Sequence, residues 1–351
     1  MRTTLDPRLV DPTGFEPGLV VDVRDERRAL LFDLGAVERL APRLLLRVTH
    51  AFVSHAHMDH FAGFDHLLAL GLGRVRRLVL WGGPGFADRV EHKLRAYTWN
   101  VVHRYAVPMT IEAHALAPDG TRTNARFDSA ERFARTDIAA VGAADGAAAE
   151  CNGAPDAARD DVLLDEPLFR VRAGFVDHEM PVLAFAIEEK AQVRVAADRI
   201  AARGLATGPW LRTLKDAVLA GAPDDTPIDI AWRDRAGAHA ERHPVGALRS
   251  LVLDTVPGRR IGYVTDLRYT EANVERLAGL LDGVDVLYIE SVFLDADRDH
   301  ALRKNHLTAR QAGTIARRLG AKRVVPFHFS PRYRGAEDAL RDEVEAAWQG
   351  R

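Results

Sequence analysis

The chain of 351 residues contains a single cysteine, Cys151. One thiol cannot form an internal disulfide or a thiolate metal cluster, so any metal chemistry must use histidine and carboxylate side chains. The sequence also lacks an apolar run of the roughly 20 residues that a membrane-spanning helix needs. Its first residues lack the apolar core of a signal peptide. We therefore expect a cytoplasmic protein with no membrane partner.

Neither sign of charge is in excess, because 48 Lys and Arg residues face 50 Asp and Glu residues. Hydrophobic residues make up 47% of the chain and charged residues 28%, which excludes a mostly disordered or fibrous protein. Residues 303–334 depart from this balance, with nine Lys or Arg and no Asp or Glu. This segment is either a solvated helix face with Arg-rich loops or a surface that attracts a phosphate-bearing substrate.

Apolar runs alternate with helical patterns along the chain, which predicts a layered α/β fold. Most of the strand-like runs end at His, Asp or Glu, and α/β folds place their chemistry at strand ends and in the loops that follow. The predicted strands are Ala29 to Leu34, Ala51 to Ser54, Arg77 to Leu80, Pro181 to Ile187, Ile261 to Thr265, Val286 to Ile289 and Arg323 to Phe327.

Two stretches interrupt this pattern. Residues 141–160 are rich in Ala, Gly and Asp, and we expect a flexible insertion there, with an Ala-rich helix as the alternative. The second stretch carries several Gly and Pro residues, together with Trp210, Leu211, Leu214 and Val218 at helical spacing. We expect a single domain over residues 1–351 with an arm-like insertion at about 199–245.

The strongest chemical signal is the segment SHAHMDH, which follows an apolar strand and precedes a helical pattern. His55 and His57 are spaced to face one metal ion, while Asp59 and His60 face a second. Imidazole and carboxylate ligands suit zinc and related divalent ions, and sites of this kind keep a position open for water. We interpret the segment as the first part of a two-metal centre.

Three further residues at strand ends complete the candidate ligand set. His178 lies just before a strand, whereas Asp266 and His328 end two others. Each by itself is also explained as a core polar group or a cap. Together with the first motif, they supply two metal sites with one carboxylate to bridge them.

Glu290 and His306 look catalytic without being ligands. Glu290 ends a strand, and His306 precedes the segment Thr308 to Gln311, which has the pattern of a capping box opening a helix. A histidine beside a basic segment, oriented by a carboxylate, suits a general acid. The alternative is that His306 is a surface residue.

The segments FDLG, SHAHMDH, DHEMP, TDL, IESV, NHLT and HFSPRY occur in this order and resemble the metallo-β-lactamase superfamily, and within it the tRNase Z endoribonucleases. The resemblance implies a four-layer αβ/βα sandwich that holds two zinc ions. It assigns one metal to His55, His57 and His178, the other to Asp59, His60 and His328, and the bridge to Asp266.

The resemblance also suggests residues that contact the substrate. It places Thr308, Ser330 and Arg332 near the substrate phosphate, and it likens Gly208 and Pro209 to part of an arm that grips tRNA. A homodimer would let the arm of one subunit hold tRNA for the site of the other. The chain departs from the usual family pattern around two residues, with Thr-Asp-Leu at Asp266 and Ile-Glu-Ser-Val at Glu290.

We predict a zinc-dependent phosphodiesterase that removes the 3′ trailer of precursor tRNA, although manganese also suits the ligands. Asp59 would orient or deprotonate the nucleophile, and His306, oriented by Glu290, would act as the acid. Because of the departures from the family pattern, the alternative substrate is a 3′,5′-cyclic nucleotide or another small phosphodiester. A non-catalytic RNA-binding protein and a lactam or thioester hydrolase are competing hypotheses.

Overall fold

The computed structural model describes residues 4–138, 161–190, 192–203, 207–234, 237–256 and 258–351. The insertion expected at 141–160 lies outside them. The chain divides into two compact units, of which the first comprises Met1–Glu189 with Arg259–Arg351 and the second Lys190–Gly258. The arm expected at about 199–245 falls within the second unit, whose bounds are wider.

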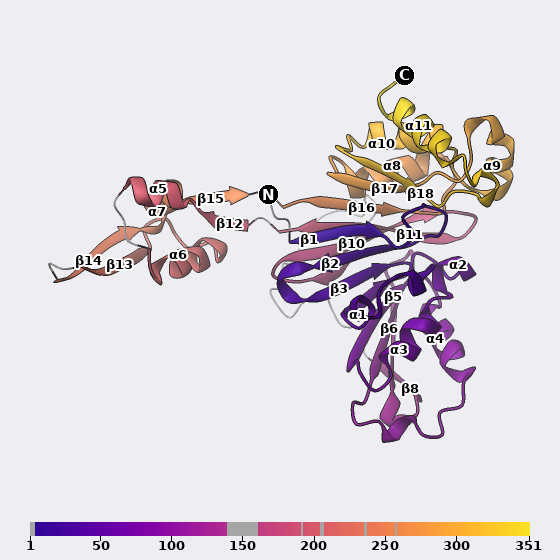
Figure 1. Cartoon of the computed structure of the whole chain (residues 1–351), viewed down its shortest axis with the longest axis horizontal. Coiled ribbons are helices and arrows are strands. Elements are labelled where there is room, and N and C mark those ends of the chain that lie inside the picture. The colour runs from indigo at the N-terminus through magenta and orange to yellow at the C-terminus, as the bar shows by residue number, and fades with distance from the viewer. Residues whose placement is uncertain (1–3, 139–160, 191, 204–206, 235–236, 257) are drawn as a thin grey trace. The chain divides into compact units, whose positions relative to one another are not determined.

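Two sheets form the centre of the first unit (Figure 1). The eight-stranded sheet runs in sequence order and is parallel from β3 to β6. Its strands are β1 (Leu5–Leu9), β2 (Leu19–Val23), β3 (Arg28–Phe32), β4 (Val48–Phe52), β5 (Arg77–Gly82), β6 (Thr110–Leu116), β7 (Arg122–Asp128) and β8 (Arg135–Ile138). The six-stranded sheet has the order β18 (Val324–Phe327), β17 (Val286–Glu290), β16 (Arg260–Val264), β11 (Pro181–Glu189), β10 (Phe169–Asp177) and β9 (Asp161–Asp165).

Helices cover the outer face of each sheet (Figure 1). Beside the eight-stranded sheet lie α1 (Pro42–Leu45), α2 (Met58–Phe61), α3 (Phe64–Gly71) and α4 (Phe86–Arg95). Beside the six-stranded sheet lie α8 (Glu271–Leu281), α9 (Arg298–Lys304), α10 (Ala309–Arg318) and α11 (Glu337–Trp348). Short 3-10 turns are η1 (Arg24–Glu26), η2 (Val37–Arg39), η3 (Val102–Arg104), η4 (Ser129–Glu131), η5 (Asp295–Asp297) and η6 (Pro331–Tyr333).

The strands are apolar on both faces because each sheet lies between helices and the other sheet. In β3, Leu31 packs in the cluster under α3 and α4, whereas Phe32 belongs to the cluster between the sheets. The ring centroids of Phe32 and Phe185 lie 5.4 Å apart across that inner core. The predicted αβ/βα sandwich is confirmed, and the seven predicted strands overlap with β3, β4, β5, β11, β16, β17 and β18, although the one predicted at Ala51 to Ser54 shares only two residues with β4.

The second unit has a small core of its own, which includes Trp210, Leu214, Ile230 and Leu248. It contains the strand pair β12 (Gln192–Val195) and β15 (Leu253–Val256), the hairpin β13 (Pro227–Asp234) and β14 (Gly237–Pro244), and the helices α5 (Ala197–Ala202), α6 (Trp210–Leu219) and α7 (Val245–Val252). The predicted helical spacing from Trp210 to Val218 is confirmed by α6. Across the described residues of the chain, no helix has the length and apolar character to span a membrane.

Candidate metal centre and active site

The predicted site residues meet at one edge of the two sheets. His55, His57, Asp59 and His60 follow β4, and His178 lies in the turn between β10 and β11. Strands β16, β17 and β18 are parallel neighbours, so their carboxyl ends meet at one edge of the sheet. These three ends carry Asp266, Glu290 and His328.

The backbone turns sharply where several of these side chains leave their strands. Asp33, Asp266 and His328 each follow a strand by one or two residues and have φ of 55°, 48° and 60°. This left-handed region is uncommon for residues other than glycine and costs of order 1–3 kcal/mol at each position. The fold therefore bears a local cost to place these side chains at the site.

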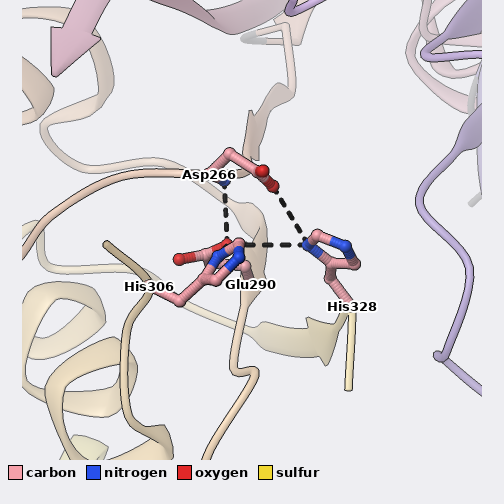
Figure 2. Close-up of side chains that lie close together, drawn as sticks. All are labelled: Asp266, Glu290, His306 and His328. Carbon is pink, nitrogen blue, oxygen red and sulfur yellow. Dashed lines mark hydrogen bonds and ion pairs between the residues drawn. The ribbon is translucent and has the colours of Figure 1, made fainter. Parts of the chain in front are cut away.

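Asp266 is the centre of the cluster. Its Oδ2 lies 3.4 Å from Nε2 of His55 and 3.5 Å from Nε2 of His178. Its Oδ1 lies 3.4 Å from Nε2 of His60 and 3.0 Å from Nδ1 of His328. One carboxylate oxygen thus faces each half of the predicted ligand set, as a bridging carboxylate requires. Figure 2 shows the contacts that join Asp266, His328 and Glu290.

The donor set fits divalent cations. Asp266 groups with His57 and His178, and Asp59 groups with His60 and His328, with the potential ligand atoms of each group within 4.8 Å of one another. Nε2 of His55, Nε2 of His60 and Nδ1 of His328 are buried and lie 3.0–3.4 Å from the carboxylate of Asp266, but among the described residues none of them makes a hydrogen bond of ordinary geometry. Such nitrogens are costly unless something satisfies them, and imidazole is a preferred ligand of zinc.

The carboxylate of Asp266 and the imidazoles around it shift one another's pKa values. Burial alone would raise the pKa of Asp266, but the neighbouring His60 and His328 hold it well below its ordinary value. Burial likewise opposes charge on His60 and His328, yet the carboxylate of Asp266 raises the pKa of both. The site is therefore organised around a permanent negative charge that attracts cations.

Two further groups orient the imidazoles of His60 and His178 through the ring nitrogen that does not face Asp266. Nδ1 of His60 lies 2.8 Å from Oδ2 of Asp33, and Nδ1 of His178 lies 2.8 Å from the carbonyl oxygen of Asn305. Asp33 also accepts hydrogen bonds from the hydroxyls of Ser54 and Tyr263, both at 2.9 Å. Contacts of this kind fix the ring orientation of metal ligands. Asp33 lies in the FDLG segment at the end of β3, and the sequence alone predicted no role for it.

The buried Glu290 and the partly buried His306 form a pair next to this cluster. Oε2 of Glu290 lies 3.0 Å from Nδ1 of His306, and the carboxylate also accepts from the backbone N–H groups of Asp266 at 2.9 Å and Leu307 at 2.8 Å. Burial would raise the pKa of Glu290, but His306 and the hydrogen bonds lower it to about 2. Against the opposing effect of burial, Glu290 raises the pKa of His306. The arrangement favours a protonated imidazole.

The residues predicted to contact substrate lie at the start of α10, at η6 and before α6. Thr308 is buried and caps α10 by accepting from the N–H of Gln311 at 3.2 Å, and its hydroxyl donates to Asp295 at 3.0 Å. The predicted capping box is therefore confirmed. Ser330 precedes η6, where Arg332 faces Asp297 at 3.4 Å. Gly208 and Pro209 precede α6 in the second unit. Contact of any of these with a substrate stays a prediction.

Comparison with known proteins adds independent information. Residues 226–329 match the model of a Beta-lactamase superfamily domain. A ribonuclease Z from Deinococcus radiodurans is 34% identical over 311 residues, covering 88% of this chain and 84% of that protein. A ribonuclease Z from Porphyromonas gingivalis is 26% identical over 332 residues, covering 92% and 86%. The structure of human tRNase Z, short form, superposes with a TM-score of 0.53 at 19% identity over 93% of this chain and 90% of that one, which shows a shared fold.

Proposed function

Because this chain belongs to the ribonuclease Z family of metallo-β-lactamase-fold hydrolases, we propose that it cleaves precursor tRNA in the cytoplasm and removes the 3′ trailer. The observation that carries the proposal is the contact between Glu290 and His306, which lies beside the donor cluster around Asp266. A two-metal cluster by itself fits many hydrolases. A charged acid at its edge suits a substrate whose leaving group must be protonated.

We propose that two zinc ions bind at this centre, with manganese as the other ion that suits the donors. His55, His57 and His178 would hold one ion, Asp59, His60 and His328 the other, and Asp266 would bridge them. In support, Asp266 groups with His57 and His178 and also with His55 and His60. When bound, such ions supply positive charge for the phosphate oxygens and make a nucleophilic water available near neutral pH.

Asp59 is placed to orient that water. Its contacts with His60 and His328, at 3.4 and 3.3 Å, both use Oδ2. Within the described part of the chain Oδ1 has no partner, so it is available to accept a hydrogen bond. Although burial opposes it, His328 and His60 lower the pKa of Asp59, which therefore stays ionised at neutral pH. A fixed carboxylate of this kind holds an attacking water in line with the phosphorus.

His306 is placed to protonate the leaving oxygen. Glu290 engages Nδ1, so Nε2 is the nitrogen that faces the substrate. As the bond between the water oxygen and phosphorus forms, a proton of that water passes to Asp59, and the bond between phosphorus and the 3′ oxygen of the tRNA breaks. The proton of Nε2 passes to that oxygen. The products are a tRNA with a 3′ hydroxyl and a trailer with a 5′ phosphate.

The second unit is the proposed tRNA-gripping arm. Gly208 and Pro209 open α6, whose Arg212 has a side chain that is 91% exposed. Exposed cations there suit the phosphate backbone of tRNA. Arg212 lies 4.0 Å from Asp216, and Arg199 is engaged with Asp254. We further propose a homodimer in which the arm of one subunit holds the tRNA that its partner cleaves.

A paired cleavage assay tests this function. The zinc-loaded protein is offered precursor tRNA with a 3′ trailer and, separately, 3′,5′-cyclic AMP and cyclic GMP. We expect a single cut at the 3′ end of the mature tRNA sequence and weak turnover of the cyclic nucleotides. Rapid cyclic nucleotide hydrolysis with intact precursor tRNA would contradict the proposal, and His306→Ala serves as the control for a contaminating nuclease.

A further inference from the structure

A basic cavity lies at the end of β4 that is remote from the metal centre. Arg47 directly precedes β4, whereas Ser54 and the ligands follow it, so the two places are roughly 20–25 Å apart along the strand. Strand β3 lies between β2 and β4, antiparallel to the first and parallel to the second. The end of β2 and the beginning of β4 therefore lie at the same edge of the sheet, one on each side of β3. The cavity has a volume of about 850 Å³ and is lined by Arg8, Asp22, Arg24, Arg27, Arg43 and Arg47, with Ala41 and Leu44 between them.

Positive charge dominates this cavity. Asp22 is the only acidic residue in the lining, and it pairs with Arg47. Asp6 lies outside the lining and pairs with Arg24 at 2.9 Å. Within the described part of the chain, the guanidinium groups of Arg27 and Arg43 have no carboxylate partner, and both residues are exposed. The cavity therefore holds two exposed cations, Arg27 and Arg43, that have no carboxylate partner among the described residues.

A second cavity continues the first. It has a volume of about 610 Å³, shares Arg8, Ala41 and Leu44 with the first, and adds Arg39 and Arg323. The two together form one basic groove, defined here by the linings of both cavities. Its arginines come from separate parts of the fold, with Arg8 in β1, Arg24 in η1 and Arg323 just before β18. The second cavity is otherwise lined mainly by apolar residues, and its Arg39 pairs with Asp11, so the positive charge is concentrated in the first cavity.

We infer that the basic groove binds the phosphate backbone of RNA at a distance from the cleaved bond. Small-molecule pockets are lined mainly by apolar side chains, whereas six of the eight residues that line the larger cavity are charged. A guanidinium group matches the two oxygens of a phosphate. Several of them in a row suit a polyanion. A flat membrane surface does not reach arginines such as Arg47 that lie inside a cavity.

The identity of the RNA rests on the proposed function, which makes it a part of precursor tRNA away from the scissile phosphate. The test variant is Arg27→Gln/Arg43→Gln. The matched control is Arg132→Gln/Arg276→Gln, which removes two exposed arginines that line neither cavity and have no carboxylate partner among the described residues. Both pairs are made in the zinc-loaded His306→Ala protein so that bound RNA stays intact.

Filter binding of labelled precursor tRNA is measured from 50 to 300 mM KCl. We expect the groove variant to bind about tenfold more weakly at 100 mM KCl and to lose about 2 from the slope of log affinity against log salt. The control should keep the affinity and slope of its parent. An unchanged Tm shows that both proteins fold, and Arg43→Glu should weaken binding further.

Unchanged affinity and slope in the groove variant would overturn the inference. It would also be overturned if the groove variant kept its RNA affinity but lost binding to phosphatidylserine vesicles, because the groove would then serve a membrane. Its failure is distinct from failure of the proposed function. A His306-intact protein that binds precursor tRNA through the groove but does not cleave it would support the groove and contradict the nuclease.

Discussion

Oε2 of Glu290 lies 3.0 Å from Nδ1 of His306, while both oxygens of the same carboxylate are held by backbone N–H groups. The carboxylate is fixed before any substrate arrives, because Asp266 and Leu307 donate to it from two different loops. His306 therefore has one orientation and one favoured protonation state. A general acid prepared in this way loses little to reorganisation during the reaction.

Removal of the proposed acid, His306, should slow cleavage without releasing the metal ions. We expect His306→Ala to lower kcat on precursor tRNA by about 10² to 10⁴, the usual contribution of a positioned acid. Glu290→Gln should lower it less, because the amide oxygen can still accept from His306. Zinc content, from mass spectrometry of the purified protein, should match wild type in His306→Ala. Full activity in that variant would remove His306 from the mechanism.

Asp33 should control metal affinity through His60. Asp33→Asn keeps the side-chain volume and tolerates the left-handed backbone, but it removes the negative charge and leaves one acceptor oxygen. That oxygen cannot accept both from the N–H of Ser54 and from Nδ1 of His60, as the two oxygens of Asp33 do. Loss of such a supporting contact typically costs 10- to 100-fold in metal affinity. Chelator competition should show that loss, and Tyr263→Phe should retain the wild-type affinity. Equal affinities in all three proteins would show that Asp33 does not position the ligand.

The second unit should be needed for tRNA and dispensable for a small ester. The N–H of Glu189 donates to the carbonyl of Arg259 at 2.9 Å, and β11 and β16 are antiparallel. An Asn-Gly turn can therefore replace Lys190–Gly258 and close a hairpin. We expect this deletion to lower kcat/KM on precursor tRNA by about 100-fold, equivalent to roughly 2.7 kcal/mol. Turnover of bis(p-nitrophenyl) phosphate should persist, and its loss would show that the unit supports the fold.

Buried His50 should make the protein sensitive to acid. Burial lowers the pKa of His50 to about 4, below the ordinary value of 6.5. The unfolded chain therefore binds a proton that the folded chain does not, and the unfolding free energy should fall as the pH drops from about 6.5 to 4. The full effect is at most roughly 3 kcal/mol.

Urea unfolding at pH 7, 6, 5 and 4.5 measures this dependence. Burial also lowers the pKa of His178, so the informative quantity is the difference between wild type and His50→Gln. The variant should have the shallower fall, and His66→Gln, at an exposed position, should follow wild type. Identical slopes in wild type and His50→Gln would contradict the assignment.

The sequence predicted which potential metal ligands the fold brings together, because most of them lie in local motifs. In SHAHMDH, three imidazoles and a carboxylate lie within seven residues after a strand, so a short turn brings them together. Asp266, Glu290 and His328 could be predicted because each ends an apolar strand, and parallel neighbours place such ends at one edge. The regular strands and the helix at Trp210 followed from periodicity in the same way.

Other features depend on contacts between distant segments. Asp33 is 27 residues from His60, and only the completed sheet shows that they touch. The basic groove joins arginines from separate elements whose spacing in the sequence has no pattern. Thr308, predicted from family resemblance to contact substrate, has its hydroxyl engaged by Asp295 and Gln311, because the capping box needs it.

The most direct test of the account uses precursor tRNA in which sulfur replaces the 3′ oxygen at the scissile phosphate. Thiolate is a good leaving group and needs no acid. Wild type should cleave this sulfur substrate and the ordinary oxygen substrate at the same bond. His306→Ala should lose about 10² to 10⁴ in kcat on the oxygen substrate and little on the sulfur substrate. An equal loss on both would contradict protonation of the leaving group by His306, and no cleavage of either by wild type would contradict the proposed function itself.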